Sequence, residues 1–240
     1  MGVGDLVGFP SKLAIRIWIK LLPYNPNNLG NWSIKGIKHN QETSVIERGL
    51  ICQMIDLYSA QKNEFEGYIT SGGTESNIFS AWLGRNFFEG KGIKKEKIIL
   101  IKTSLTHYSI EKAADIIGIK TFITPLNEKN WNMDVGGLKK TIQELQKQGY
   151  KGFLLPLTLG YTLTGTFDPF EEICVLIRRL KKDFQDIEFF LWLDAAINGL
   201  IEPFLNESFK PFKYPEIKTF LTDFHKFKGL KRFIEKALSS

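Results

Sequence analysis

Residues 153–196 read FLLPLTLGYTLTGTFDPFEEICVLIRRLKKDFQDIEFFLWLDAA, and this stretch decides the fold of the chain. It begins with a short apolar run typical of a strand and ends with a second one that closes on an acidic residue. Between them, DPFEEICVLIRRLKKD has the apolar spacing of a helix, with Asp168 expected as its N-cap and Pro169 at its first position. Strand, helix and strand in this order predict a parallel crossover unit.

The same alternation continues on both sides of this unit. Further strands are expected at 67–70 (GYIT), 97–101 (KIILI), 119–124 (IKTFIT) and 217–224 (IKTFLTDF), and further helices at 44–60, 74–88, 107–118 and 134–149. This pattern predicts an α/β fold with a mainly parallel sheet flanked by helices on both faces. In such sheets ligands bind at the carboxyl ends of the strands, which is where the polar motifs of this chain fall.

Composition narrows the function classes. The 240 residues are 43% hydrophobic and carry a formal charge of +6, which is ordinary for a globular protein of one large domain with a partial second. The basic tail 229–240 is interpreted as a solvated helix face, so we expect no nucleic-acid partner. Neither Cys52 nor Cys174 has metal-type spacing, and no apolar run is long enough for a membrane helix. We therefore expect a cytosolic protein with no metal site and no membrane partner.

The stretch GYITSGGTESN, residues 67–77, is a candidate phosphate site. Glycines permit close approach of the backbone, and free N–H groups at a helix start attract anions. An ordinary N-cap is the alternative, because Thr74 and Asn77 resemble a capping pair. The stretch is not a P-loop, since it lacks the Gly-Lys-Ser/Thr element.

Three other positions are candidates for chemistry. Asp194 closes an apolar run, where a carboxylate needs a partner such as a protonated pyridine nitrogen, although a helix N-cap is an equal alternative. His107 begins a helix and either caps it or stacks on an aromatic ligand. Lys226, beside His225, has the position at a strand end from which an amine forms an imine once its pKa is lowered.

Together these motifs resemble the group II pyridoxal-phosphate decarboxylases, over roughly residues 25–228. The resemblance rests on GYITSGGTESN, THYSIEKAA, LGYTLTGTFDP, WLDAAINGLIEPF and DFHKF, and it is strongest to the histidine and serine decarboxylase branch. It implies the large domain of the aspartate-aminotransferase-like fold (fold type I). The expected division is an N-terminal arm at 1–43, an incomplete cofactor-binding large domain at 44–228, and the tail at 229–240. Trp192 stands where relatives often carry a His.

The resemblance also implies roles for individual residues. Lys226 would hold pyridoxal 5'-phosphate as a Schiff base, Asp194 would face the ring nitrogen and His107 would stack on the ring. These three are the expected catalytic residues. The expected cofactor-binding set adds the phosphate-binding Gly73 and Thr74, Thr158 at the ring edge, Ala196 against a ring face, and His225 near the phosphate or substrate.

The implied activity is decarboxylation of an L-amino acid, histidine- or serine-like, to the amine and CO₂. A homodimer, or a complementary chain, is the expected assembly. The chain ends 14 residues after Lys226, so the small C-terminal domain of the family is expected to be missing. Two alternatives stay open: a catalytically impaired truncated homologue or subunit of a split decarboxylase, and another lyase or transaminase on the same fold.

Overall fold

The computed structural model describes residues 12–21, 42–60 and 67–222, which fall into two compact units. One unit comprises residues 1–69 and 224–240, and the other residues 70–223. In the first unit, α1 (Lys12–Leu21) and α2 (Glu42–Leu57) are the described helices. In the described part of the chain, no helix is both long and apolar enough to span a bilayer.

The second unit is built on a five-stranded sheet in which every strand pair is parallel. The strands lie in the order β2-β1-β3-β4-β5. Their bounds are β1 (Ile98–Lys102), β2 (Lys120–Ile123), β3 (Gly152–Thr158), β4 (Glu188–Ala195) and β5 (Ile217–Thr222). All of β3 and nearly all of β4 are buried, which explains their continuous apolar sequence.

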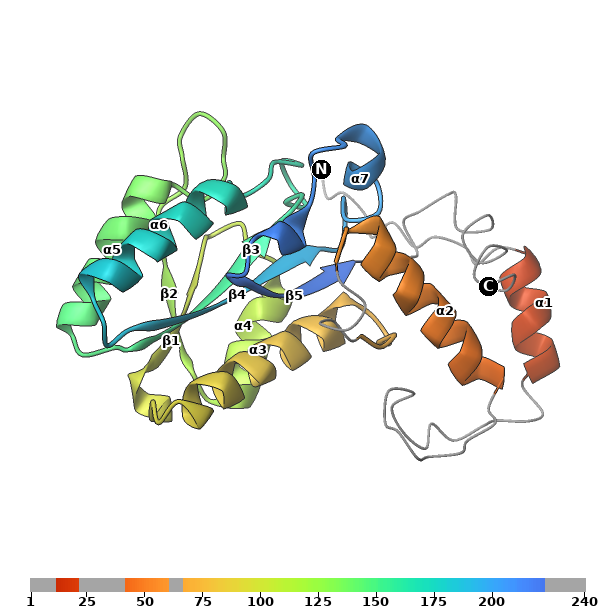
Figure 1. Ribbon diagram of the computed structural model, residues 1–240, viewed down its shortest axis with the longest axis horizontal. Helices are drawn as coiled ribbons and strands as arrows, with labels where there is room; N and C mark the ends of the chain where they lie inside the picture. The colour runs from red at the N-terminus through yellow and green to blue at the C-terminus, as the bar shows by residue number, and fades with distance from the viewer. Residues whose placement is uncertain (1–11, 22–41, 61–66, 223–240) are drawn as a thin grey trace. The chain divides into compact units, whose positions relative to one another are not determined.

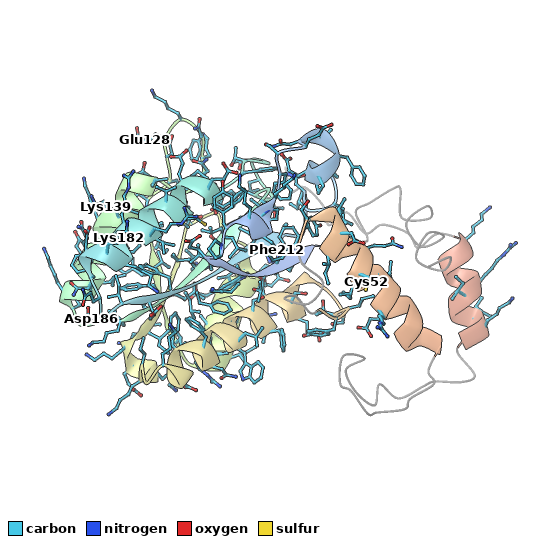
Figure 2. The ribbon with its side chains drawn as sticks, viewed as in Figure 1. Cys52, Glu128, Lys139, Lys182, Asp186 and Phe212 are labelled. Atoms are coloured by element: carbon cyan, nitrogen blue, oxygen red, sulfur yellow. The ribbon has the colours of Figure 1, made fainter. Side chains whose placement is uncertain are left out.

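Helices cover both faces of the sheet. Figure 1 shows α5 (Val135–Lys147) and α6 (Phe170–Asp183) on one face, and α3 (Gly73–Gly90) and α4 (Tyr108–Ile117) on the other. The remaining elements of this unit are the short α7 (Glu202–Leu205) and the 3₁₀ turns Lys95–Lys97 and Pro211–Lys213. The outer faces are charged: Lys139 on α5 and Lys182 on α6 are exposed (Figure 2).

One glycine sets how closely α3 approaches the sheet. A Cβ atom added at Gly84 would overlap the side chain of Leu154 and would lie 2.9 Å from Cδ1 of Phe190. Any larger residue would push α3 away from β3 and β4. This close approach brings the first turn of α3 near the end of β4.

The direction in which successive strands are added to the sheet reverses between β1 and β3. From β1 the chain passes through α4 to β2 on one side, and then returns through α5 to β3 on the other. Pairing between β1 and β3 stops at Leu154, two residues before Pro156, which has no N–H to donate. In α/β sheets, ligands bind at such a switch point, outside the carboxyl ends of the strands.

The predicted α/β fold and parallel sheet are confirmed, with two local corrections. GYIT, residues 67–70, is not a strand, because the N–H of Ile69 donates to the Glu47 side chain at 2.8 Å and no sheet neighbour takes it up. Asp168 is not the N-cap of α6, which begins after Pro169 without a side-chain cap. Its carboxylate instead accepts hydrogen bonds from Met133 and Thr158.

Candidate functional site

Asp194 and Thr158 lie side by side at the carboxyl edge of the sheet. They are register partners in the pairing of β3 with β4, and the N–H of Leu159 donates to the Asp194 carbonyl at 2.8 Å. The Asp194 side chain is only 6% exposed. A carboxylate so far from water is costly unless hydrogen-bond donors surround it.

The donors to the Asp194 carboxylate come from α3 and from the chain just beyond β4. Asn77 Nδ2 donates to Oδ2 at 2.9 Å, and the N–H of Ala196 donates to Oδ1 at 3.3 Å. Both donors are neutral, so the carboxylate has no countercharge among the described residues that bond to it. The arrangement leaves Asp194 suited to a cationic N–H.

Asn77 is the residue that sequence reasoning missed. It lies on α3 and is 1% exposed, and it does not cap the helix with Thr74. Its Nδ2 also donates to Ser109 Oγ at 3.0 Å, and its Oδ1 accepts from Trp192 Nε1 at 3.0 Å. Contacts to two separate segments, α4 and β4, cannot be read from spacing, because 117 residues separate Asn77 from Asp194.

His107 caps α4 and also presents an exposed ring. Its Nδ1 accepts from the N–H of Ser109 at 3.3 Å and lies 2.7 Å from Ser109 Oγ. The capping interpretation is therefore confirmed. His107 is an exposed residue, and its ring lies beside the Tyr108 ring, with 4.3 Å between the ring centroids. Through Ser109 and Asn77, His107 is linked to Asp194.

Thr158 has a buried hydroxyl without a partner. Its backbone N–H donates to Asp168 Oδ2 at 2.7 Å, whereas Oγ1 is buried and unbonded among the described residues. A buried polar atom that no protein group satisfies costs stability and calls for an explanation. A ligand with a polar edge at this strand end would give the Thr158 hydroxyl a hydrogen-bond partner.

The start of α3 lies beside the end of β4. A Cβ atom at Gly73 would be 3.8 Å from Cβ of Ala196, and Gly72 precedes the helix without a side-chain cap. Thr74 is half-buried in the first turn. The hydroxyl of Ser76 is already engaged at 2.7 Å by Thr70 Oγ1. The predicted anion site is thus next to the candidate ring site, with Gly73 and Thr74 as its available groups.

Glu75 occupies the first turn of the same helix. Its carboxylate accepts from the hydroxyl and the N–H of Ser71, at 2.6 and 2.8 Å, and these bonds lower the pKa of Glu75. The side chain is exposed, so its charge is screened by water. The Glu75 carboxylate is thereby hydrogen-bonded to Ser71, in the turn that precedes α3.

Two expected residues fall outside the described part of the chain: His225 and Lys226. The last described residue before them is Thr222, which ends β5 and is the register partner of Ala195. The strand that leads to Lys226 is therefore the neighbour of the strand that carries Asp194.

A second polar cluster lies on the other side of Thr158. Tyr161 Oη is 2.9 Å from both Thr103 Oγ1 and Asp168 Oδ1. Burial is the main cause that raises the pKa of Asp168 to about 6, against hydrogen bonds that lower it. Burial and the neighbouring Asp168 also raise the pKa of Tyr161. This cluster joins the ends of β1 and β3 and was not predicted.

The first cluster has the donors and acceptors that suit a flat cationic heterocycle bearing an anionic group. Its groups are the buried Asp194 carboxylate, the exposed His107, the glycine-led start of α3 and the Thr158 hydroxyl, which is unbonded among the described residues. These features fit pyridoxal phosphate: Asp194 for the ring nitrogen, Thr158 for a polar ring substituent and the start of α3 for the phosphate.

Comparison with known proteins also points to pyridoxal phosphate. Residues 42–232 match the pyridoxal-dependent decarboxylase conserved domain. The chain is 30% identical over 219 residues to a tryptophan decarboxylase of Clostridium sporogenes, covering 87% of this chain and 51% of the relative. It is 27% identical over 198 residues to a histidine decarboxylase of Morganella morganii, covering 82% and 48%. The chain thus spans about half the length of the curated relatives it matches.

Solved structures share the fold. L-methionine decarboxylase from Streptomyces sp. 590 superposes with a TM-score of 0.70 at 19% identity, covering 87% of this chain and 54% of that one. This likeness confirms the predicted fold type I large domain, and the family domain confirms pyridoxal phosphate as the expected cofactor. The chain therefore belongs to the family of pyridoxal-dependent decarboxylases.

Proposed function

We propose that this chain binds pyridoxal phosphate through Lys226 and takes part in the decarboxylation of an L-amino acid to its amine and CO₂. The observation that carries the proposal is the Asp194 carboxylate, buried at the carboxyl end of β4, whose donors among the described residues are neutral and lie at 2.9 and 3.3 Å. Such a group stabilises a proton on a ring nitrogen. The strand next to it, β5, leads to Lys226.

Each residue has a proposed part in binding. Asp194 holds the proton at the ring nitrogen, and the face of His107 stacks on the ring. Thr158 Oγ1 donates to the ring edge, and Ala196 packs against a ring face. The phosphate is bound by Gly73 and Thr74, in reach of the backbone N–H groups of α3, with His225 beside the phosphate or substrate.

The bound cofactor supplies the electron sink that accepts the electron pair left when CO₂ departs. Everything else is done by the chain. Asp194 keeps the ring nitrogen protonated, which preserves the strength of that sink. His107 fixes the plane of the ring and so the direction in which the carboxylate leaves. The buried apolar residues of β3 and β4 exclude water from the surroundings of Asp194.

Absorption spectroscopy tests cofactor attachment directly. Purified protein mixed with pyridoxal phosphate should develop a yellow band that borohydride abolishes, leaving the cofactor covalently fixed to the chain. Lys226→Ala should lose both the band and the attachment, whereas Lys228→Ala, two residues away, should keep them. A wild-type protein that stays colourless at saturating cofactor would refute the proposal.

The substrate is proposed to be histidine- or serine-like. The motifs favour that branch, although a tryptophan decarboxylase is among the relatives at 30% identity. Release of CO₂ from histidine, serine, tryptophan and tyrosine should be compared at equal concentration. A clear preference for tryptophan or tyrosine would overturn the substrate assignment while leaving the cofactor assignment intact.

A second candidate concerns activity and leaves the fold unchanged. We propose as the alternative a catalytically impaired homologue, or a subunit of a split decarboxylase, that keeps the cofactor. Amine formation by the purified chain alone would exclude it. The arm at 1–43, the large domain at 44–228, the tail at 229–240, homodimerisation and a cytosolic location likewise remain predictions.

A further inference from the structure

A continuous series of hydrogen bonds connects Trp192 with His107. Trp192 Nε1 donates to Asn77 Oδ1 at 3.0 Å, and Asn77 Nδ2 donates to Ser109 Oγ at 3.0 Å. Ser109 Oγ in turn lies 2.7 Å from His107 Nδ1. Trp192, Asn77 and Ser109 are all at most 1% exposed, so water does not compete for these bonds.

The chemistry of the groups fixes the direction of every bond. An indole N–H donates and never accepts, so the oxygen of Asn77 must face Trp192. The amide nitrogen must then face Asp194 and Ser109. At the far end, the backbone N–H of Ser109 donates to His107 Nδ1 at 3.3 Å, so Nδ1 is an acceptor. The Ser109 hydroxyl therefore accepts from Asn77 and gives its own proton to Nδ1.

We propose that Asn77 is a positioning residue that couples the two groups flanking the cofactor ring. One N–H of its amide holds Asp194 Oδ2, while the other, acting through Ser109, fixes the imidazole of His107 as the Nε2–H tautomer. Trp192 anchors the amide in the orientation that permits both. The hydrogen bonds that connect Trp192 with His107 do not depend on the proposed function. The role of Asn77 in positioning the groups around the cofactor rests on that function.

The tautomer of His107 is measurable in cofactor-free protein. The chain has three histidines, so a His39→Gln/His225→Gln background leaves His107 as the single imidazole. In that background, ¹⁵N NMR of the full chain should show one Nε2–H tautomer. The measurement does not depend on cofactor binding, and failure of the relay is therefore distinguishable from failure of the proposed function.

Asn77→Asp is the decisive variant, because it keeps the shape of the side chain and removes both N–H donors. The introduced carboxylate should draw the Ser109 hydroxyl proton toward itself, leaving Nδ1 free to carry a proton. The population should shift from Nε2–H toward Nδ1–H. Asn132→Asp is the matched control: Asn132 Nδ2 donates to the Phe167 carbonyl at 2.8 Å, away from the relay, and the tautomer should not change.

Ser109→Ala is a smaller change that keeps the test decisive if Asn77→Asp does not fold. It leaves Nδ1 with only the longer backbone bond, so a second tautomer should appear beside Nε2–H. The inference is overturned if the folded variants all retain the single Nε2–H tautomer of the parent. In cofactor-loaded protein, Asn77→Asp should also shift the absorption maximum of the bound cofactor, and Asn132→Asp should not.

Discussion

Two buried carboxylates at the carboxyl edge of the sheet, Asp168 and Asp194, differ in how their oxygens are used. Asp168 accepts from two backbone N–H groups, those of Met133 and Thr158, and from the Tyr161 hydroxyl. Asp194 accepts from one amide and, at 3.3 Å, from one backbone N–H. The comparison teaches that burial alone does not mark a site, because the described residues give the Asp168 oxygens more hydrogen-bond donors than the Asp194 oxygens.

The largest expected effect is on Asp194. Asp194→Asn keeps an oxygen that can accept from Asn77, so the free energy of unfolding should change by less than about 1 kcal/mol. It removes the charge that holds a proton on the ring nitrogen, so amine formation by the loaded enzyme should fall by about 10²- to 10⁴-fold. Steady-state rates beside urea unfolding curves test both statements, and a large loss of stability would place Asp194 in the same class as Asp168.

The opposite pattern is expected for Asp168. Asp168→Ala leaves two backbone N–H groups without an acceptor and removes one of the two partners of the Tyr161 hydroxyl, which should cost on the order of 3 kcal/mol of unfolding free energy. Tyr161→Phe removes one donor only, and should cost about 1 kcal/mol. Chemical denaturation measures both. Equal costs for the two variants would contradict the view of Asp168 as a structural hub.

Asp168 also predicts a pH dependence with a definite sign. Its pKa is raised in the folded protein from 3.8 to about 6, so between these values the folded state binds more protons than the unfolded state. Its contribution to stability is present at low pH and is lost as pH rises through about 6, by on the order of 3 kcal/mol. The difference in unfolding free energy between wild type and Asp168→Ala should therefore shrink from pH 4 to pH 7. A difference that stays constant from pH 4 to pH 7 would show that Asp168 does not titrate in this range.

The smallest effect is expected at Thr158, which belongs to both the Asp194 cluster and the Asp168 cluster. Thr158→Val removes only the unbonded hydroxyl, so the cofactor-free protein should lose no stability and should gain up to about 1 kcal/mol. Cofactor affinity, followed by absorption titration, should weaken by about tenfold, since one hydrogen bond is lost. A destabilised apo protein would mean that the hydroxyl has a structural partner.

Much of the fold follows from sequence pattern. The apolar runs of β3 and β4 and the helical spacing of α6 predicted the crossover unit, because buried parallel strands are continuously apolar and helices repeat every 3.6 residues. Asp194 was singled out because it closes an apolar run, whereas the parts expected of Thr158 and Ala196 came from the family resemblance. The failure at GYIT has a local cause: a short apolar run carries too little information to show that the N–H of Ile69 bonds to a side chain.

By itself, the sequence determined which residues end strands at one edge of the sheet, and so which acid and hydroxyl would meet there. Only the tertiary structure decided how each one is used. Asn77 faces Asp194 because Gly84 lets α3 pack closely against β3 and β4, and Asp168 faces Thr158 because the chain turns back after β3. Hydrogen bonds depend on distances of a few tenths of an ångström between segments far apart in the chain, and no periodic pattern encodes such distances.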